Sequence, residues 1–271
     1  MRLEHKVQPV KKNHSIKEVV ISLFLQNPIL KPERFEKLIS SGYKDSFQQF
    51  DRISQFQVQF QKKTEGGKSA SLKHEQNAGF KFISFKNGQV NRLLQGINET
   101  HRTFISYHNL DYERWNSFYE DYKKNITLLS DIQSDIFIKA FSLHYIDELI
   151  WIDDDCPIDL TLLLKGNREK IPGDFFKSEN PSFSIVSEKQ IQDAIYFDRL
   201  EIRVNPTIIP SLVISHNVTE DLDEEILLDQ LFQSDFEQKI EDMHSYNKEL
   251  LNSILQEEVQ SLIGLTQNTK K

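Results

Sequence analysis

Short runs in which apolar and polar residues alternate constrain the fold of this chain more than any other feature. Residues 55–61 alternate strictly between glutamine and an apolar residue, which predicts a strand with one buried and one solvated face. The dipeptide Asn87-Gly88 predicts a hairpin, because both residues adopt the left-handed conformations that a tight turn needs. Apolar runs at 19–25 and 103–107 predict further strands. These patterns indicate an antiparallel sheet with a core on one side.

Helices are predicted between the strands. A segment at 32–42 opens with proline and ends with glycine, and a longer one, with Asp111 as its expected cap, carries apolar residues at helical spacing up to residue 129. After it we expect a strand at 136–152, a short helix at 158–164, strands at 183–186, 194–204 and 208–218, and a long helix at 234–263. Residues 62–76 show no periodicity and are predicted to form a loop.

This order of elements predicts the architecture. A strand, a helix, several strands and a helix occur twice, which favours an α+β fold of two tandem β-α-β(3-4)-α halves. Each half would be a helix grip, as in TATA-binding-protein-like folds, and the halves would share a curved antiparallel sheet and end in a long C-terminal helix. The predicted boundary gives an N-terminal half at 1–132 and a C-terminal half at 133–271, which contains the acidic C-terminal helix.

Composition narrows the class of protein. The chain has 271 residues, of which 11% are aromatic, enough for a sizeable core. No stretch approaches the roughly 20 apolar residues of a membrane span, so a membrane partner is not expected. The single cysteine, Cys156, excludes an internal disulfide, and the basic N-terminus lacks the apolar run of a secretory signal. Both features predict a reducing, cytoplasmic environment.

Acidic residues are concentrated near the C-terminus. Residues 220–262 contain 13 acidic and 2 basic residues, although the formal charge of the whole chain is only −8. A solvated helix face would explain this pattern. The alternative is a surface that docks a basic protein partner, where complementary charge speeds association.

Several segments together resemble a family of sporadically distributed bacterial conserved-hypothetical proteins of uncharacterised function. The run at 79–88 is similar to a G-F-x-F-x-S-x-[DN]-G motif, and the run at 112–118 to Y-x-x-W-x-x-F. The run at 144–147 resembles an R-Y-I-N strand, and the run at 243–247 resembles part of a helix with an L-H-x-x-N pattern. The motifs follow one another in order over most of the chain.

Two positions depart from the family pattern. His144 stands where the family has arginine, and Asp147 stands where it has asparagine. With their motif neighbours Tyr145 and His244, they are the first candidates for a binding site. The resemblance implies lateral transfer and a defence or toxin-control operon, with a partner encoded nearby. It implies no catalytic residue and no cofactor.

Residues with metal or acid–base chemistry are few. Asp153 and Asp155 could supply the oxygen ligands that Mg²⁺ prefers, or could belong to a solvated loop before a helix. No H-E-x-x-H motif and no cysteine–histidine pairing that would indicate zinc occurs in the sequence. We therefore predict no catalytic residue, no metal site beyond these two weak candidates, and no cofactor.

The sequence thus leaves three functions open. The favoured one is a non-enzymatic accessory protein that binds a protein partner. The second is a nucleic-acid-binding protein that uses the curved sheet and a cluster of basic residues in the first half, represented by Lys81 and Lys86. The third is a metal-dependent hydrolase or nuclease that uses the two aspartates and a histidine. A homodimer is an open alternative for the oligomeric state.

Overall fold

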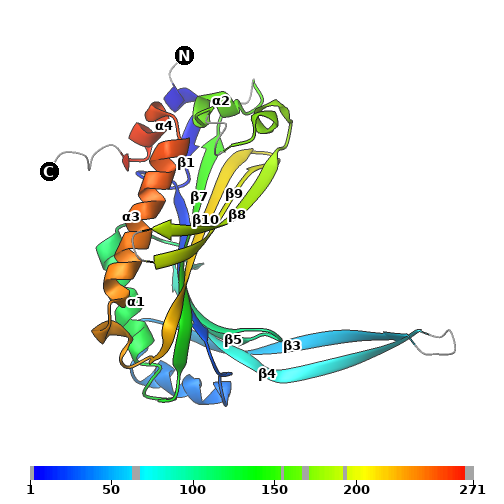
Figure 1. Ribbon diagram of the computed structural model, residues 1–271, viewed down its shortest axis with the longest axis vertical. Coiled ribbons are helices and arrows are strands. Elements are labelled where there is room, and N and C mark those ends of the chain that lie inside the picture. Colours follow the sequence, from blue (N-terminus) through cyan, green and yellow to red (C-terminus); the bar gives the residue numbers. More distant parts are fainter. Residues whose placement is uncertain (1–2, 63–67, 154–155, 167–170, 192–193, 266–271) are drawn as a thin grey trace.

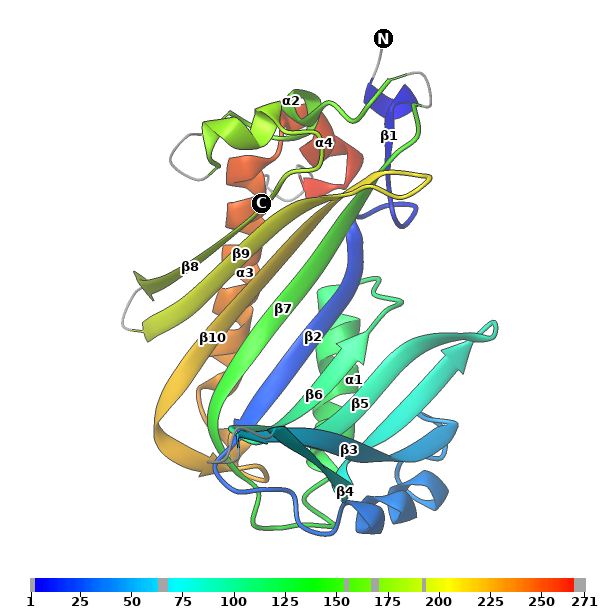
Figure 2. The ribbon, with the colours of Figure 1, turned by 90° about the vertical axis from the view of Figure 1, so that its right-hand side faces the viewer.

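A single open antiparallel sheet organises the molecule. The computed structural model describes residues 3–62, 68–153, 156–166, 171–191 and 194–265, with side chains undescribed at 55–77, Ile191 and Ala194. Within these residues ten strands form one sheet in the order β3-β4-β5-β6-β2-β7-β10-β9-β8, and β1 pairs with one end of β7 (Figures 1 and 2). The protein is therefore of the α+β class, with an extended antiparallel sheet as predicted.

Two stretches of chain meet in the middle of this sheet, where β2 and β7 pair. On its other edge β2 pairs with β6, the last of the strands β3–β6 that follow it in the chain. In the same way β7 pairs with β10, the last of the strands β8–β10. The strands are β1 (Val7–Pro9), β2 (Ile16–Leu25), β3 (Gln49–Lys62), β4 (Lys68–Lys86), β5 (Gln89–Asn98), β6 (Thr103–Asn109), β7 (Phe137–Trp151), β8 (Ser182–Ile191), β9 (Ala194–Asn205) and β10 (Ser211–Leu227).

The two longest helices, α1 and α3, cover the same face of the sheet (Figure 1). The opposite face is turned toward the viewer in Figure 2 and carries no helix across its middle. The helices are η1 (Leu3–His5), η2 (Pro32–Ser40), α1 (Trp115–Thr127), α2 (Leu160–Leu163), η3 (Gly173–Lys177), η4 (Leu231–Gln233), α3 (Phe236–Ile254) and α4 (Glu257–Leu262). No helix among the described residues is both long enough and apolar enough to cross a bilayer.

The core lies between the sheet and its helices, and β7 shows why. Its alternate residues Phe141, Leu143 and Tyr145 are at most 1% exposed and pack with buried residues of α1 and α3. The residues between them, such as Ser142 and His144, belong to the open face. Toward the other end of β7, Trp151 packs in a second cluster with buried residues of α2 and α4.

Three local predictions were wrong. Part of the expected loop, residues 68–76, belongs to strand β4. Its backbone pairs with β3 from Lys62↔Lys68 onward, and backbone pairing does not require the alternation of apolar residues on which the prediction relied. The expected long C-terminal helix is two helices, since α3 ends at Ile254 and α4 starts at Glu257. Asp111 does not cap α1, which begins at Trp115.

A long hairpin of β3 and β4 extends away from the sheet on its open side (Figure 1). At its base, β4 passes very close to β5. A Cβ atom on Gly79 would lie 2.1 Å from the carbonyl oxygen of Gly96, so only glycine permits this approach. At the far end of β4, Asn87 (φ 54°) and Gly88 (φ 78°) form the predicted hairpin turn.

Candidate functional site

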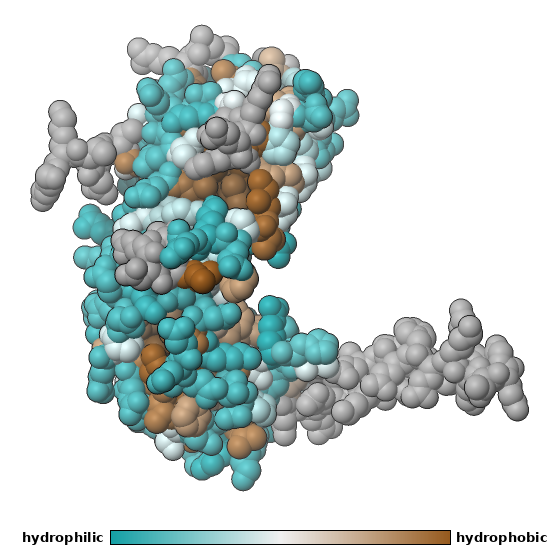
Figure 3. Space-filling view, in the orientation of Figure 1, coloured by the Kyte–Doolittle hydropathy of each residue, from teal (hydrophilic) through white to brown (hydrophobic). Residues whose placement is uncertain are grey.

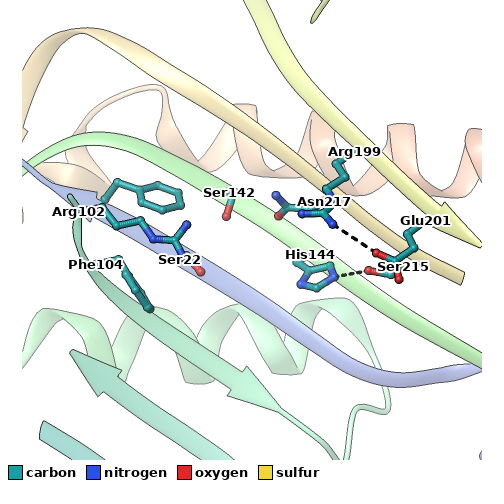
Figure 4. Close-up of a pocket in the computed structure, with 10 residues that line it drawn as sticks. Ser22, Arg102, Phe104, Ser142, His144, Arg199, Glu201, Ser215 and Asn217 are labelled. Atoms are coloured by element: carbon teal, nitrogen blue, oxygen red, sulfur yellow. Dashed lines mark hydrogen bonds and ion pairs between the residues drawn. The ribbon is translucent and has the colours of Figure 1, made fainter. Parts of the chain in front are cut away.

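Small hydroxyl residues line up across the centre of the open face. The register places Thr219 of β10 opposite Ser142 of β7, Ser142 opposite Ser22 of β2, and Ser22 opposite Ser106 of β6. Because these side chains are short, the molecular surface is concave over them. The result is a hollow of about 330 Å³, the serine hollow, lined by Ser22, Phe24, Arg102, Phe104, Ser142, His144, Arg199, Glu201, Ser215 and Asn217 (Figure 4).

One wall of the serine hollow is aromatic. Phe24 of β2 and Phe104 of β6 are opposite each other in the register, and their ring centres are 6.3 Å apart. The guanidinium of Arg102 lies 5.4 Å from the centre of the Phe104 ring, a cation–π distance. Arg102 also donates to the carboxylate of Glu99 at 2.6 Å. This wall therefore offers an apolar surface with the Arg102–Glu99 ion pair at its edge.

The other wall is polar. His144 Nε2 and Ser215 Oγ are 2.7 Å apart, so a hydrogen bond joins β7 to β10 (Figure 4). Arg199 and Arg203 of β9 both approach Glu201, at 3.4 Å and 3.7 Å. Two guanidinium groups that share one carboxylate leave a net positive charge on this side of the hollow.

His144 is uncharged at neutral pH. Burial lowers the pKa of its imidazole to about 4, against the opposing effect of Glu18, and Arg199 is among the cations that lower it further. A neutral ring can accept a proton from Ser215, as in a catalytic dyad. Among the described residues, however, Ser215 is the only side chain hydrogen-bonded to this ring, so no carboxylate orients it. Within the described residues, the His144–Ser215 pair therefore lacks the third group of a catalytic triad.

The other binding candidates, Tyr145, Asp147 and His244, lie on the helix-covered side of the sheet. The Tyr145 hydroxyl and His244 Nδ1 are 2.7 Å apart, and the His244 ring stacks on Trp115 with centres 4.2 Å apart. Asp147 is buried and accepts a hydrogen bond from Ser15 Oγ at 2.6 Å. Of the four candidates, His144 alone lines the serine hollow.

Burial also shifts the pKa values of these core groups. It lowers the pKa of His244 to about 3, with a smaller effect from the charge of Lys248. It raises the pKa of the Asp147 carboxyl to about 6, although the hydrogen bond from Ser15 acts in the opposite direction. Both residues are therefore part of the packing between sheet and helices.

The predicted basic residues are paired with acids. Lys81 lies 3.3 Å from Asp51, and Lys86 lies 2.5 Å from Asp111. Asp111, the expected helix cap, therefore holds the end of β4 instead. An ion pair between exposed side chains reduces the positive charge that a phosphate would meet at these two positions.

Of the two predicted metal candidates, only Asp153 lies within the described residues. Asp153 lies 3.2 Å from Lys6, and Asp155 is outside the described residues. Across the described part of the chain, no group of three or more histidine, cysteine, aspartate or glutamate side chains is arranged to hold a metal ion.

Sequence reasoning missed most residues of the hollow, although a signal was present. In each of four strands a serine interrupts an otherwise core-type sequence: Ser22 in β2, Ser106 in β6, Ser142 in β7 and Ser215 in β10. A polar residue inside a short apolar run marks the side chain that points away from the core. Three of these serines occupy one row across the sheet.

Comparison with protein-family models, curated proteins and solved structures found no match. The site must therefore be interpreted from its own geometry.

Proposed function

We propose that this chain is a non-enzymatic binding protein and that a protein partner occupies the serine hollow. The observation that carries the proposal is the position of the hollow on the sheet face that α1 and α3 leave uncovered (Figures 2 and 4). A sheet face that is neither wholly apolar nor wholly charged suits a protein surface better than a lipid surface.

The two walls indicate what the partner presents. The Phe24–Phe104 pair favours an apolar side chain, which would lie over the hydroxyl groups of Ser22 and Ser142. The guanidinium of Arg199, which shares the single carboxylate of Glu201 with Arg203, favours an acidic group beside that side chain. We therefore expect the partner to insert an apolar residue that has an acidic neighbour.

Charge reversal at the hollow tests the proposal. The full chain, tagged, is used to capture its partner from the native cell, and the captured protein is then purified for affinity measurements. Arg199→Glu should weaken its binding by at least about tenfold, the loss typical of one charged contact at an interface. Arg52→Glu is the matched control, because Arg52 is similarly exposed, at 53% against 58%, and lies away from the hollow. Equal affinities of the two variants would refute the assignment.

Nucleic acid is the second candidate function. The guanidinium of Arg102 beside the Phe104 ring and that of Arg199 on the other wall would attract phosphate, and the rings of Phe24 and Phe104 offer surfaces for base stacking. If nucleic acid is the ligand, the captured material absorbs at 260 nm and its affinity falls steeply with salt. Charge reversal at Lys81 and Lys86 would then weaken binding together with Arg199→Glu.

We also propose that residues 1–132 and 133–271 are two helix-grip halves of the TATA-binding-protein-like kind. The support is topological. The first long strand of each half, β2 or β7, is central in the sheet and pairs with the last strand of its own run, and a helix, α1 or α3, follows that run.

Membership of the sporadic bacterial family is a further part of this proposal. Its weak motifs meet in space, since Tyr112 and Tyr145 are in ring contact and Trp115 stacks on His244. Three separate motifs thus form one junction among β7, α1 and α3. In this interpretation Tyr145, Trp115 and His244 hold the two halves together, and the partner, encoded nearby, binds in the serine hollow on the other face.

A further inference from the structure

A second concave site lies on the helix side of the molecule, between α1 and α3. It measures about 380 Å³ and is lined by Trp115, Asn116, Tyr119, Glu120, Glu237 and Glu241, which we call the acidic-aromatic groove. Its residues belong to α1 and α3, which cover the face of the sheet opposite to the serine hollow (Figure 1). It therefore has no part in the function proposed for the hollow.

The groove has more negative than positive charge. Lys123 lies 3.5 Å from Glu237. Within the described residues, neither Glu120 nor Glu241 takes part in an ion pair. Exposed carboxylates on two neighbouring helices repel one another unless a cation lies between them.

Tyr119 provides an independent indication of a ligand. Its side chain lines the groove, the residue is only 6% exposed, and its hydroxyl has no hydrogen-bond partner among the described residues. A buried hydroxyl without a partner is costly and uncommon in folded proteins. Burial and the charges of Glu237, Glu120 and Glu241 raise the pKa of Tyr119, so the hydroxyl stays protonated.

Trp115 gives the groove an oriented aromatic wall. Its indole Nε1 donates to a carboxylate oxygen of Glu241. Its ring stacks on His244 at an interplanar angle of 10°, and the Tyr119 ring lies beside it with centres 5.8 Å apart. His244 is neutral, so it adds no positive charge that would compete with a cation in the groove.

We propose that the acidic-aromatic groove binds an arginine side chain from a basic segment of a partner protein. A guanidinium group is planar, has five N–H donors and stacks on aromatic rings. It therefore fits a groove that combines the aromatic rings of Trp115 and Tyr119 with carboxylates. The Tyr119 hydroxyl would gain the hydrogen-bond partner that it lacks. A lysine side chain would supply the positive charge but could not stack a planar group on the aromatic rings.

The two tryptophans of the chain make a direct test feasible. In a ¹⁵N-labelled full chain each indole N–H gives its own NMR signal, assigned with Trp115→Phe and Trp151→Phe. The probe is the peptide acetyl-Gly-Arg-Gly-amide, compared with its citrulline and lysine versions. We expect the arginine peptide to shift the Trp115 signal in a saturable manner. The Trp151 signal should stay in place, because that indole donates to the Cys156 carbonyl at 2.9 Å.

Three variants sharpen the result. Glu241→Gln should weaken peptide binding about tenfold, since it removes a charged hydrogen-bond acceptor. Tyr119→Phe should also weaken binding without lowering stability, because the hydroxyl has no partner to lose. Glu249→Gln, an exposed residue of α3 outside the groove, is the matched control and should change binding less than about twofold.

Specific outcomes would overturn the proposal. Equal weakening by Glu249→Gln and Glu241→Gln would show attraction to the net charge of the helix alone. Equal binding of the lysine or citrulline peptide would exclude recognition of a guanidinium group. A Trp115 signal that does not move with the arginine peptide would exclude the groove as the site.

Discussion

Two histidines on opposite faces of the sheet each form a hydrogen bond of the same length, but in different surroundings. His144 contacts Ser215 and His244 contacts Tyr145, each at 2.7 Å. The first bond lines an open hollow, whereas the second is enclosed between sheet and helices. Neighbouring residues of β7 thus have different surroundings. His144 lines the hollow in which we propose that a partner binds, and Tyr145 packs in the core. Four experiments test this difference, in order of decreasing expected effect.

The largest effect is expected from removal of the buried ring. Tyr145→Ala should lower the free energy of unfolding by about 3–5 kcal/mol, since it leaves a cavity in the core. His144→Ala, one residue away, should cost about 1 kcal/mol, the net value of one hydrogen bond. Urea denaturation of both variants at pH 7.5 measures the difference. Similar losses would show that the two faces are equally important for stability.

The second effect depends on pH. The pKa of Asp147 is raised to about 6 from a usual value of 3.8, so its favourable contribution is complete below about pH 4 and is lost as the pH rises through 6. Asp147→Asn keeps an acceptor for Ser15 and cannot ionise. At pH 7.5 it should be more stable than the wild type by up to about 3 kcal/mol.

The same variant should match the wild type at pH 4, where the carboxyl of Asp147 is protonated. Thermal unfolding at both pH values provides the comparison. A variant that is less stable at pH 7.5 would mean that the ionised carboxylate has a stabilising partner.

The third experiment compares the two hydrogen bonds directly. Tyr145→Phe leaves the His244 nitrogen without its partner inside the core, at an expected cost of about 1–3 kcal/mol. Ser215→Ala breaks a bond that water can replace, at a cost of about 0.5 kcal/mol. Denaturant midpoints of the two variants, with unchanged slopes, give the result. A reversed order would contradict the assignment of faces.

The smallest effect is expected outside both sites. Lys81→Ala breaks an exposed pair with Asp51 and should change stability by less than about 0.5 kcal/mol. A larger loss, measured in the same urea titration, would show that this pair supports the base of the β3–β4 hairpin.

Much of the fold was predictable because its signals are local. The alternation at 55–61 and the Asn87-Gly88 turn each specify structure within a few residues, and the predicted strand and hairpin turn were both confirmed. The predicted buried and solvated faces of the 55–61 strand concern side chains outside the described ones. The strand at 68–76 was not predictable from its own sequence, because it is formed by backbone pairing with β3 and its residues show no apolar alternation. The end of α3 at Ile254 was missed because the apolar spacing continues into α4.

The candidate site was harder to predict than the fold. The resemblance to a family directed attention to Tyr145, Asp147 and His244, whose sequence positions do not reveal that they face the core. The serines of the hollow come from four separate strands and become neighbours through the register of the sheet. The alternation of apolar and polar residues within one strand predicts on which face of the sheet a residue lies. Its neighbours on the adjacent strands depend on the strand order and register of the whole sheet.

The pairing of β2 with β7 also sets the timing of folding. Leu23 of β2 lies opposite Phe141 of β7, so the chain must close a loop of more than a hundred residues to form this pair. During synthesis, β2 leaves the ribosome long before its central partner and keeps one edge unpaired in the interval. Folding of the first strands should therefore finish only after β7 has emerged. The chain would then be most vulnerable to aggregation and proteolysis while it is about half made.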